Sequence, residues 1–346
     1  MTTRTKAMIG GGTAVLLLAV GAYFVLGNKE LEDVPLLGSV VEDPKCPLTG
    51  AEPKNEKVAA RPAVAVKIEN NFAAYPLSGL EDADVVYEEV VEGGLTRFLA
   101  IYHCADAAKA GPVRSARTID PAIVIPYTRI LAAAGGNDTV RAELEANDIF
   151  SIDENTAGGA MSRAERPGIS SEHTLYGNTS ALRKLGDKRF DDPPSDDIFE
   201  FGDVQSPSKK VSSVTVNMSS TVVRYEWDGD KWLRIDHDAR LTMESGVEIA
   251  VDNVLLEQHT VNLSETLGDV IGSASTEIAD VTGRGKAVLF RDGRQIVGRW
   301  TRDSIDSPVV FETKSGDTMV LHEGTTWIEL VPDDKGDVKG SFSVEK

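Results

Sequence analysis

The longest uninterrupted run of hydrophobic and small residues lies near the start of the chain, where residues 7–26 contain no charged side chain. About twenty such residues form an α-helix long enough to cross the hydrocarbon core of a bilayer. Arg4 and Lys6 precede the run and acidic residues follow it, so the positive-inside rule leaves the N-terminus in the cytoplasm. We therefore expect residues 1–27 to be an uncleaved transmembrane anchor of a single-pass cell-membrane protein whose bulk is extracytoplasmic.

A cleaved signal peptide is the alternative interpretation of the same run. The hydrophobic core of such a peptide usually has about 7 to 15 residues and ends in a cleavage site of small residues. Residues 7–26 exceed that length and lack a clear site of this kind. The first cysteine, Cys46, lies well beyond the run, so the sequence offers no residue for lipid attachment at its end.

Residues 28–60 are rich in Pro, Glu, Lys and Gly and show no sustained hydrophobic period, which is typical of a flexible stalk. We expect order to begin near Arg61. Residues 61–207 alternate short runs rich in β-branched and apolar residues with helical patterns, which favours a mixed α/β domain. The strand candidates are residues 63–68, 85–90, 96–102 and 130–134.

Two helices are expected in this domain. Asp138 can cap a helix that continues to residue 145, because Val140 and Leu144 then share one face. Asn178 can cap another helix that ends at residue 185. The acidic, proline-containing residues 191–197 and the Ser-Pro-Ser sequence at 206–208 break any regular pattern, so we place the domain boundary near residue 208.

Residues 208–346 show strand-length runs separated by turn dipeptides, which predicts a mainly β second domain. Asp292-Gly293 is a strong signal for a type I′ hairpin turn, and Asp228-Gly229-Asp230 and Glu323-Gly324 suggest the same design. The expected hairpins pair residues 222–227 with 231–235, 286–290 with 295–300, and 319–322 with 326–331.

The charge balance excludes one class of partner. The chain has a net charge of −19, and without residues 1–27 it retains 34 basic against 55 acidic residues, a net charge of −21. Non-specific binding to nucleic acid is therefore not expected. The histidines show no metal-ligand spacing and no cofactor-binding signature is present, so we expect neither a metal nor a cofactor.

Cys46 and Cys104 are the only two cysteines of the chain. Outside the cytoplasm a pair of thiols tends to oxidise, so we predict a disulfide that holds the segment after the stalk on the first domain. Two unpaired buried thiols are the alternative. A metal site made of two cysteines has no supporting spacing.

Charged residues gather around two of the predicted strands, 85–90 and 96–102. They are Glu88, Glu89, Glu92, Arg97, Arg114 and Arg117. If the two strands form a hairpin, the turn at Glu92 lies at the same end of the sheet as Arg97. The guanidinium groups of Arg114 and Arg117 can then hold a carboxylate or phosphate, and Ser115 can add a hydroxyl donor. The alternative is a structural network in which the arginines pair with the three glutamates.

His173 lies close to serines and a glutamate in sequence, which invites comparison with a catalytic triad. We reject a serine hydrolase, because no Gly-x-Ser-x-Gly sequence occurs and sequence neighbours rarely supply nucleophile and base to each other. Two interpretations stay open. His173 is either a structural residue hydrogen-bonded to the backbone or a general acid or base toward a bound ligand.

Short motifs along the exported part resemble those of the YerB-type family of bacterial lipoproteins, whose two regions are domains of unknown function. The motifs are Cys46-Pro47-Leu48-Thr49-Gly50, Arg61-Pro62, Ala83-Asp84-Val85-Val86-Tyr87-Glu88, Glu92-Gly93-Gly94, Thr96-Arg97-Phe98, Gly111 to Arg117, Gly285-Lys286-Ala287, Phe290-Arg291-Asp292-Gly293, Gly298-x-Trp300 and Gly324-x-x-Trp327 to Pro332. The resemblance covers most of the chain after the apolar run.

The resemblance implies an envelope protein in two parts. It also implies a shared site formed by Glu92, Arg97, Arg114, Arg117, His173 and Tyr176. The chain departs from the family pattern in two respects. Relatives are anchored through a lipidated cysteine, which is absent here, and the residues beside His173 differ from the usual Pro-His-Asn.

Three functions are compatible with these observations. The first is a membrane-anchored protein that binds an anionic envelope ligand through Arg97, Arg114, Ser115, Arg117 and Tyr176. The second is an enzyme, a hydrolase or transferase acting on envelope phosphates or glycans, with Glu92 or His173 as general acid or base. The third is a structural or protein-contact module in which the charges form a buried ion network.

Overall fold

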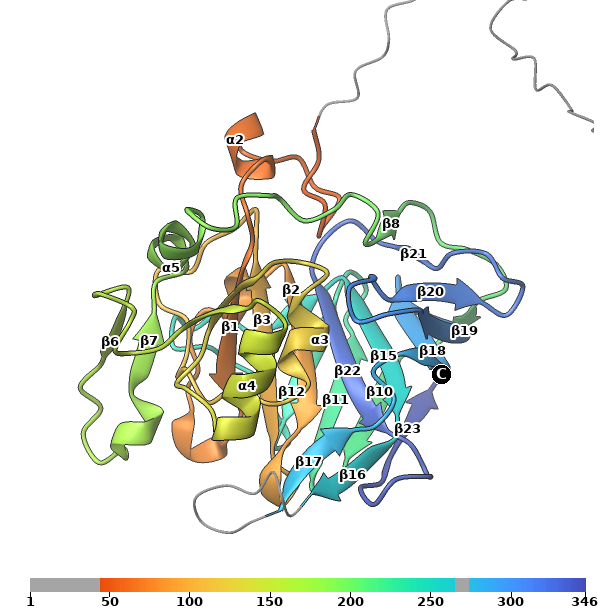
Figure 1. Cartoon of the computed structure of the whole chain (residues 1–346). Helices are drawn as coiled ribbons and strands as arrows, with labels where there is room; N and C mark the ends of the chain where they lie inside the picture. Colours follow the sequence, from red (N-terminus) through yellow and green to blue (C-terminus); the bar gives the residue numbers. More distant parts are fainter. Residues whose placement is uncertain (1–43, 265–273) are drawn as a thin grey trace, which may run out of the picture. The chain divides into compact units, whose positions relative to one another are not determined.

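A large sheet runs through the molecule and combines strands from both halves of the chain (Figure 1). The structure is a computed structural model that describes residues 44–264 and 274–346. The sheet has eleven strands. In spatial order they are β20 (Val310–Thr313), β19 (Arg294–Arg302), β18 (Gly283–Arg291), β15 (Asn253–His259), β22 (Thr326–Pro332), β2 (Val85–Val90), β3 (Thr96–Tyr102), β1 (Val64–Glu69), β4 (Ile130–Ala132) and β5 (Phe150–Ile152), with β9 (Lys209–Lys210) beside β19.

A second sheet of six strands packs against the large one. Its strands are β13 (Ala239–Arg240), β12 (Trp232–Asp236), β11 (Thr221–Trp227), β10 (Ser213–Met218) and β23 (Gly340–Glu345), with β14 (Ala250–Val251) beside β12. Three two-stranded pairs complete the strands: β16 (Val261–Ser264) with β17 (Ser275–Ile278), β21 (Val320–Leu321) with β8 (Glu200–Phe201), and β6 (Met161–Arg163) with β7 (Leu175–Gly177).

Helices are short and belong mostly to the first half of the chain. The α-helices are α2 (Glu56–Ala59), α3 (Asp120–Val124), α4 (Asp138–Ala146) and α5 (Thr179–Gly186), and the 3₁₀ helices are η1 (Phe72–Ala74), η2 (Leu80–Asp82), η3 (Glu92–Gly94) and η4 (Ser171–His173). None of the helices within residues 44–264 and 274–346 is long and apolar enough to cross a membrane. The expected anchor, residues 1–27, lies outside the described residues.

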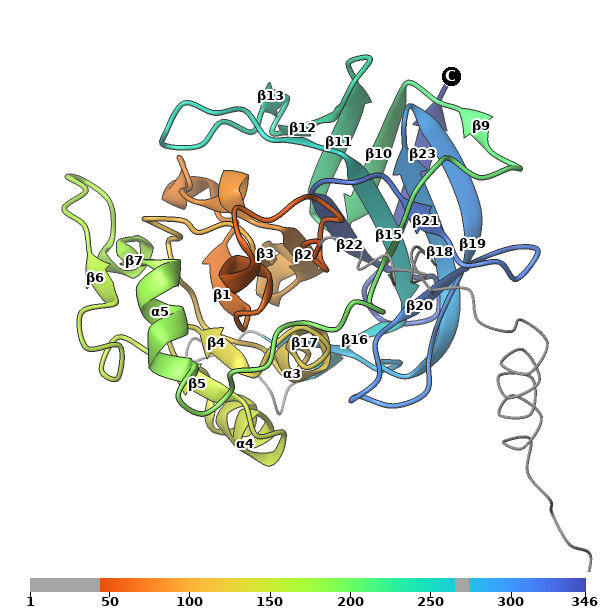
Figure 2. The ribbon, with the colours of Figure 1, turned by 90° about the horizontal axis from the view of Figure 1, so that it is seen from above.

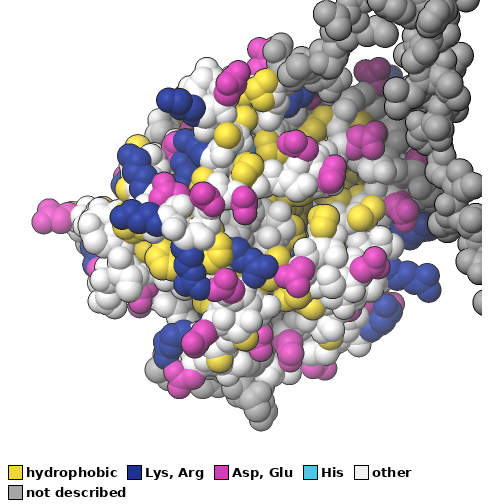
Figure 3. All heavy atoms as spheres, turned by 45° about the horizontal axis from the view of Figure 1, so that its top comes forward, with side chains coloured by type: hydrophobic (Ala, Val, Ile, Leu, Met, Phe, Trp, Pro, Cys, Tyr) yellow, Lys and Arg dark blue, Asp and Glu magenta, His cyan; other side chains and the backbone are white. Residues whose placement is uncertain are grey.

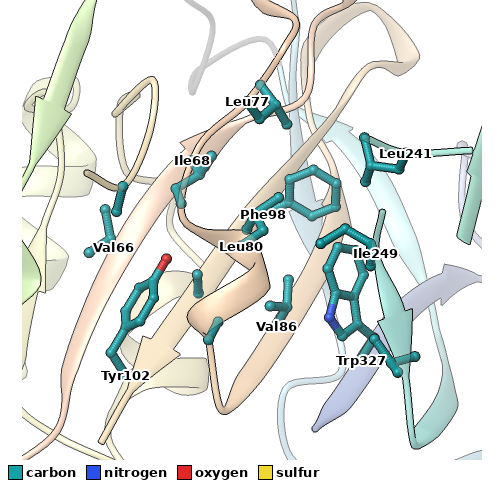
Figure 4. Close-up of a cluster of buried hydrophobic side chains, with 14 of the residues drawn as sticks. Val66, Ile68, Leu77, Leu80, Val86, Phe98, Tyr102, Leu241, Ile249 and Trp327 are labelled. Atoms are coloured by element: carbon teal, nitrogen blue, oxygen red, sulfur yellow. The ribbon is translucent and has the colours of Figure 1, made fainter. Parts of the chain in front are cut away.

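The large sheet separates two hydrophobic cores, because alternate residues of each strand point to opposite faces. One core lies between the two sheets and also receives Leu182 of α5. Within it the rings of Phe98 and Trp327 meet edge to face, 5.3 Å between centroids (Figure 4). The other core lies beneath α3 and α4 and includes Val140 and Leu144. Figure 2 shows α5 on one side of β1 and β4 and α3 and α4 on the other.

The locally encoded elements of the first half are confirmed. Strands β1, β2, β3 and β4 occupy the predicted positions, and Asn178 caps α5 by accepting a hydrogen bond from the amide of Ala181. The predicted N-cap of α4, Asp138, lies one residue after the actual one. Asn137, which has extended backbone, accepts from the amide of Val140 at 2.9 Å, and Asp138 is already the first helical residue.

Two of the three predicted hairpins are present. β11 pairs with β12, and β18 pairs with β19 across a two-residue turn in which Asp292 and Gly293 both have positive φ, as a type I′ turn requires. The hairpin across Glu323-Gly324 was wrong, because β22 pairs in parallel with both β2 and β15 while β21 pairs with β8. All seven residues of β22 are buried, which suits a strand with a partner on each edge.

Residues 44–60, expected to be part of a flexible stalk, belong to the folded structure. Leu48 is 0% exposed, and the predicted disulfide joins Cys46 to Cys104 with 6.0 Å between the Cα atoms. The stalk prediction failed here because the low hydrophobic content of the segment concealed one buried anchor residue and one covalent link.

The predicted boundary near residue 208 separates a half that contains the described α-helices from a half that is almost entirely β. The two halves are joined strand to strand, because β2 pairs in parallel with β22. Pro44–Lys346 accordingly form one compact unit. The contact between the halves is therefore part of the main sheet and its cores.

One arginine is buried completely between the two sheets. Arg234 of β12 is 0% exposed, and its Nη2 atom donates to Glu88 at 2.6 Å. Its Nη1 atom donates to Glu329 at 3.0 Å and to the hydroxyl of Tyr225 at 2.6 Å, and Asp236 lies 3.1 Å from Nη2. The guanidinium group thus has acidic partners from three different strands, which compensates for its removal from water.

Glu329 has a raised pKa within this cluster. Burial, together with the neighbouring charge of Glu88, holds the pKa of Glu329 well above its ordinary value. Oε1 of Glu329 accepts hydrogen bonds from Tyr225 and Arg234, but Oε2 accepts none. An oxygen that is buried without a donor disfavours the charged form of the carboxyl group, in agreement with the raised pKa.

Loss of the disulfide is expected to destabilise the fold. The bond closes a loop with a sequence separation of 58 residues. The chain-entropy model gives about 4 kcal/mol for a loop of this size, so Cys46→Ala combined with Cys104→Ala should lower the free energy of unfolding by about that amount. Urea unfolding measures the change. Reductant should bring the unmodified protein to the level of the double variant, and an unchanged midpoint in both cases would contradict the expectation.

Arg234→Met should cost about 3–5 kcal/mol of unfolding free energy, because it leaves Glu88 and Asp236 buried without their cation. Arg224→Met is the matched control. Arg224 lies on the adjacent strand β11, pairs with Glu226, and has a side chain that is 43% exposed. Its replacement should cost no more than about 1 kcal/mol. Similar unfolding midpoints for the two variants would show that the buried cluster does not stabilise the fold.

Glu329→Gln should change how stability depends on pH. The pKa of Glu329 is higher in the folded chain than its ordinary value of 4.5 in the unfolded chain. At pH values above 4.5 the folded state therefore binds more protons at this group than the unfolded state does. Stability from this group is complete below that value and is lost as the pH rises toward the folded pKa. The stability of the unmodified protein relative to the variant should fall by up to about 1.4 kcal/mol per pH unit in urea unfolding between pH 5 and pH 8. A difference that stays constant over this range would contradict the raised pKa of Glu329.

Candidate functional site

Most of the predicted site residues meet where several strands of the large sheet end, a place called the sheet edge below. Strands β1, β4 and β5 are mutually parallel and end there, β2 also ends there, and β3 begins there. Arg97 at the start of β3 lies opposite Glu69 of β1 and Glu89 of β2, so the three side chains share one face of the sheet. The carboxyl ends of parallel strands are where open α/β sheets usually bind ligands.

Local backbone features bring the remaining arginines to this edge. The turn η3 returns the chain from β2 to β3 through Gly93 and Gly94, both at positive φ. The amide of Arg114 donates to the carbonyl of Lys67, and the carbonyl of Arg114 accepts from the amide of Ala134, both at 2.9 Å. The segment that carries Arg114 is thereby fixed between the ends of β1 and β4.

Glu92 lies between two of the arginines. Its Oε2 atom accepts a hydrogen bond from Nη2 of Arg117 and lies 3.9 Å from Nη2 of Arg97. Its Oε1 atom accepts from the hydroxyl of Ser275 at 2.7 Å. Ser115 takes part through its backbone carbonyl, which accepts from Arg97 at 3.1 Å and Arg117 at 3.2 Å.

This environment shifts the ionisation of both kinds of group. Burial opposes ionisation of Glu92, but the hydrogen bond and charge of Arg117 outweigh it and lower the pKa of Glu92 to about 2. Burial, with the nearby charge of Arg117, lowers the pKa of Arg97 to about 10. Both groups therefore stay charged at neutral pH.

Arg114 belongs to a second group of contacts at the same edge. Its Nε atom lies 3.1 Å from Oε1 of Glu69, and Oε2 of Glu69 lies 2.6 Å from Nδ1 of His173. His173 is also 3.5 Å from the exposed carboxylate of Glu172. The side chain of Arg114 is 25% exposed, and its terminal Nη atoms form no hydrogen bond with the described residues.

Sequence reasoning missed the counter-ions Lys67, Glu69 and Asp120. Lys67 is 0% exposed and forms ion pairs with Glu89 and, at 2.6 Å, with Asp120. Burial raises the pKa of Glu89 to about 7, despite the ion pair with Lys67. A lysine within the otherwise apolar run of residues 64–68 was the signal available in the sequence, because a buried lysine needs an acidic partner.

Two residues of the predicted group lie elsewhere. Glu88 points to the opposite face of the sheet and pairs with Arg234. Of the three predicted glutamates, only Glu92 therefore pairs with arginines of the predicted site, Arg97 and Arg117. Tyr176 of β7 has the amino group of Lys109 over its ring, 4.2 Å from the centroid. Because neighbouring strand residues point to opposite sides, Tyr176 faces away from Leu175, which lines the hollow described next.

A hollow of about 440 Å³ opens beside Arg117. Its lining includes Glu92, Ser115, the Gly135-Gly136-Asn137 turn before α4, Arg141, Arg163 and the loop 153–155. Arg163 pairs with Glu154 and Arg141 with Asp138, so these two arginines are already neutralised. Arg97 and Arg114 do not line the hollow, which leaves Arg117 as its connection to the arginine group.

The outer surface does not concentrate charge of one sign on the face that Figure 3 presents. Acidic and basic side chains are interspersed there, with hydrophobic ones between them (Figure 3). Among the described residues, no group of His, Cys, Asp and Glu has an arrangement suited to holding a metal ion. The convergence of arginines at the sheet edge is therefore the feature of this region with the clearest chemistry.

Comparisons with known proteins agree with the two-part organisation. Residues 48–192 match the N-terminal domain, and residues 213–328 the C-terminal domain, of the family described as protein of unknown function DUF3048. The chain is 27% identical over 324 residues to the Bacillus subtilis (strain 168) protein named "Putative lipoprotein YerB", covering 90% of this chain and 92% of that protein. The crystal structure of Bacillus subtilis YerB superposes with a TM-score of 0.70 at 26% identity, covering 86% of this chain and 99% of that one. The chain described here belongs to this DUF3048 family of two-part proteins.

Proposed function

We propose that the chain is a membrane-associated extracytoplasmic protein that binds an anionic ligand of the cell envelope at the sheet edge around Arg117. The apolar run at residues 7–26 and the lipoprotein name of the Bacillus subtilis relative support the location. The convergence of Arg97, Arg114 and Arg117 supports the ligand class, because guanidinium groups bind carboxylates and phosphates with paired hydrogen bonds.

The charge balance at the sheet edge is compatible with binding of an anion. The charged groups are the cations Lys67, Arg97, Arg114 and Arg117 and the carboxylates Glu69, Glu89, Glu92 and Asp120. Because the pKa of Glu89 is about 7, this carboxylate holds a proton for part of the time at neutral pH. When Glu89 is protonated, the group has one more positive than negative charge, which attracts an anion, while Asp153 in the lining of the hollow opposes this attraction.

Arg117 provides the contact with a ligand in the hollow. Its Nε atom is buried and forms no hydrogen bond with the described residues, although Nη1 and Nη2 are bonded. Glu92 occupies the position of a competing anion, because its carboxylate holds Arg117 and approaches Arg97. A phosphate or carboxylate that enters the hollow displaces or shares this contact.

The test is the affinity for pyrophosphate and inorganic phosphate at low ionic strength, measured by calorimetry. Arg117→Gln should weaken binding at least tenfold, because it removes the guanidinium donor. Glu92→Gln should strengthen binding, because it removes the internal competitor and leaves an amide of the same shape. Arg240→Gln is the matched control, since Arg240 is an exposed arginine of β13 that pairs with Glu248, and it should leave the affinity unchanged.

Other outcomes would assign different roles. Equal affinity of Arg117→Gln and the unmodified protein, or no binding by Glu92→Gln, would leave the arginines as a structural ion network.

The contact between His173 and Glu69 favours an enzyme as the second candidate, because a carboxylate that holds a histidine is typical of a general base. Release of phosphate from pyrophosphate, abolished by His173→Gln, would support this candidate.

A further inference from the structure

A narrow crevice lies on the face of the large sheet that also carries the arginine group, between α3 and the ends of β15 and β19. Aliphatic side chains surround its entrance, including Ile119, Ile278, Val281 and Val309, all only partly buried. Its inner end, the buried part of the lining, carries the polar side chains of Tyr87, Tyr127, Glu257, His259 and Arg302 beside the apolar ones of Ile123, Trp300 and Leu330. An apolar entrance that leads to a few converging polar groups is the usual form of a small-molecule site.

Glu257 has one carboxylate oxygen without a hydrogen-bond partner among the described residues. The residue is 2% exposed, and its Oε1 atom is buried without a hydrogen bond among the described residues. Its Oε2 atom lies 3.2 Å from Nε2 of His259. His259 is in turn held by Asp280 at 3.3 Å and by stacking on Trp300, with 4.5 Å between ring centroids. The carboxylate is therefore fixed with an unused acceptor, and leaving such an atom unpaired is costly.

Arg302 presents an unused donor in the same crevice. Its Nε atom donates to the carbonyls of Ser304 at 3.1 Å and Ser307 at 2.9 Å, and Nη2 donates to the carbonyl of Ile305. Its Nη1 atom forms no hydrogen bond with the described residues, and Arg302 forms no ion pair with a carboxylate there. Three carbonyls thus fix the guanidinium group while leaving one nitrogen for another partner.

The charges and the size of the inner end restrict what can bind. Burial opposes protonation of His259, but Asp280 and Glu257 outweigh it and raise the pKa of His259 to about 9, so the imidazole is charged. His259 and Arg302 then balance Glu257 and Asp280. The whole crevice has only about 30 Å³ of space for water-sized groups, so its inner end holds a group no larger than one or two water molecules. A neutral, small polar group fits both conditions. A phosphate fails both, and a sugar is neutral but too large.

We propose that this crevice binds a small amphipathic molecule whose neutral head both donates and accepts hydrogen bonds, as a primary amide or a hydroxyl does. The head donates to Oε1 of Glu257 and accepts from Nη1 of Arg302. The aliphatic part of the molecule lies against the entrance formed by Ile278 and Val309. The site is separate from the arginine group and does not depend on the function proposed for it.

Hexanamide is the probe for this proposal, with hexanoate and hexylammonium as charged counterparts of the same length. The protein is labelled with 5-fluorotryptophan and titrated by ¹⁹F NMR, with the four tryptophan signals assigned through Trp→Phe variants. Hexanamide should shift the signal of Trp300 in a saturable manner, because Trp300 lines the crevice. Hexanoate and hexylammonium should bind at least tenfold more weakly, because each brings an uncompensated charge into the inner end.

Two variants and a matched control locate the binding. Val309→Phe fills the entrance and should weaken hexanamide binding at least tenfold. Val310→Phe is the control, because Val310 is the exposed neighbour that does not line the crevice. Glu257→Gln removes the charged acceptor without changing the shape of the side chain and should weaken binding about tenfold.

Four results would overturn the proposal. They are a Trp300 signal that does not respond, equal affinity of Val309→Phe and Val310→Phe, equal affinity of Glu257→Gln and the unmodified protein, and binding of hexanoate or hexylammonium as tight as that of hexanamide. Arg117→Gln should leave hexanamide binding unchanged, so failure at the arginine group and failure at the crevice are distinguishable.

Discussion

The burial of the Arg234 guanidinium group is the constraint on which the arrangement of the two family regions depends. A charge without water requires acidic partners at short range, and here they are supplied by Glu88 of the N-terminal region and by Asp236 and Glu329 of the C-terminal region. These partners meet only if β2 lies beside β22 and the second sheet covers both strands. The electrostatic requirement therefore selects one relative position of the two regions.

Strand β2 connects this cluster with the candidate site. Glu88 and Glu89 are neighbours in sequence and point to opposite faces, one toward Arg234 and the other toward Lys67. A change in the position of β2 would disturb the partners of both groups at once. The geometry of the arginines at the sheet edge thus depends on the fit between the two sheets, although Arg97, Arg114 and Arg117 all come from the first region.

Features with local causes could be predicted from the sequence, and features that depend on distant pairing could not. The strands before and after Glu92 follow from β-branched runs, and the turn at Asp292-Gly293 follows from its dipeptide. The parallel pairing of β22 with β2 joins segments far apart in the chain, which no local pattern encodes. For the same reason Glu69, which contacts Arg114 from strand β1, was not predicted as part of the site.

The parallel pairing of β2 with β22 also has a consequence for how the two regions are encoded. Without the C-terminal region, β2 would become the edge of the remaining sheet and would expose its backbone donors and acceptors to other chains. Four of its six side chains, those of Val85, Val86, Tyr87 and Val90, are apolar, so most of that edge would also be hydrophobic. A gene that encoded the N-terminal region alone would thus produce an aggregation-prone protein, which gives a physical reason for the two regions to remain together in one reading frame.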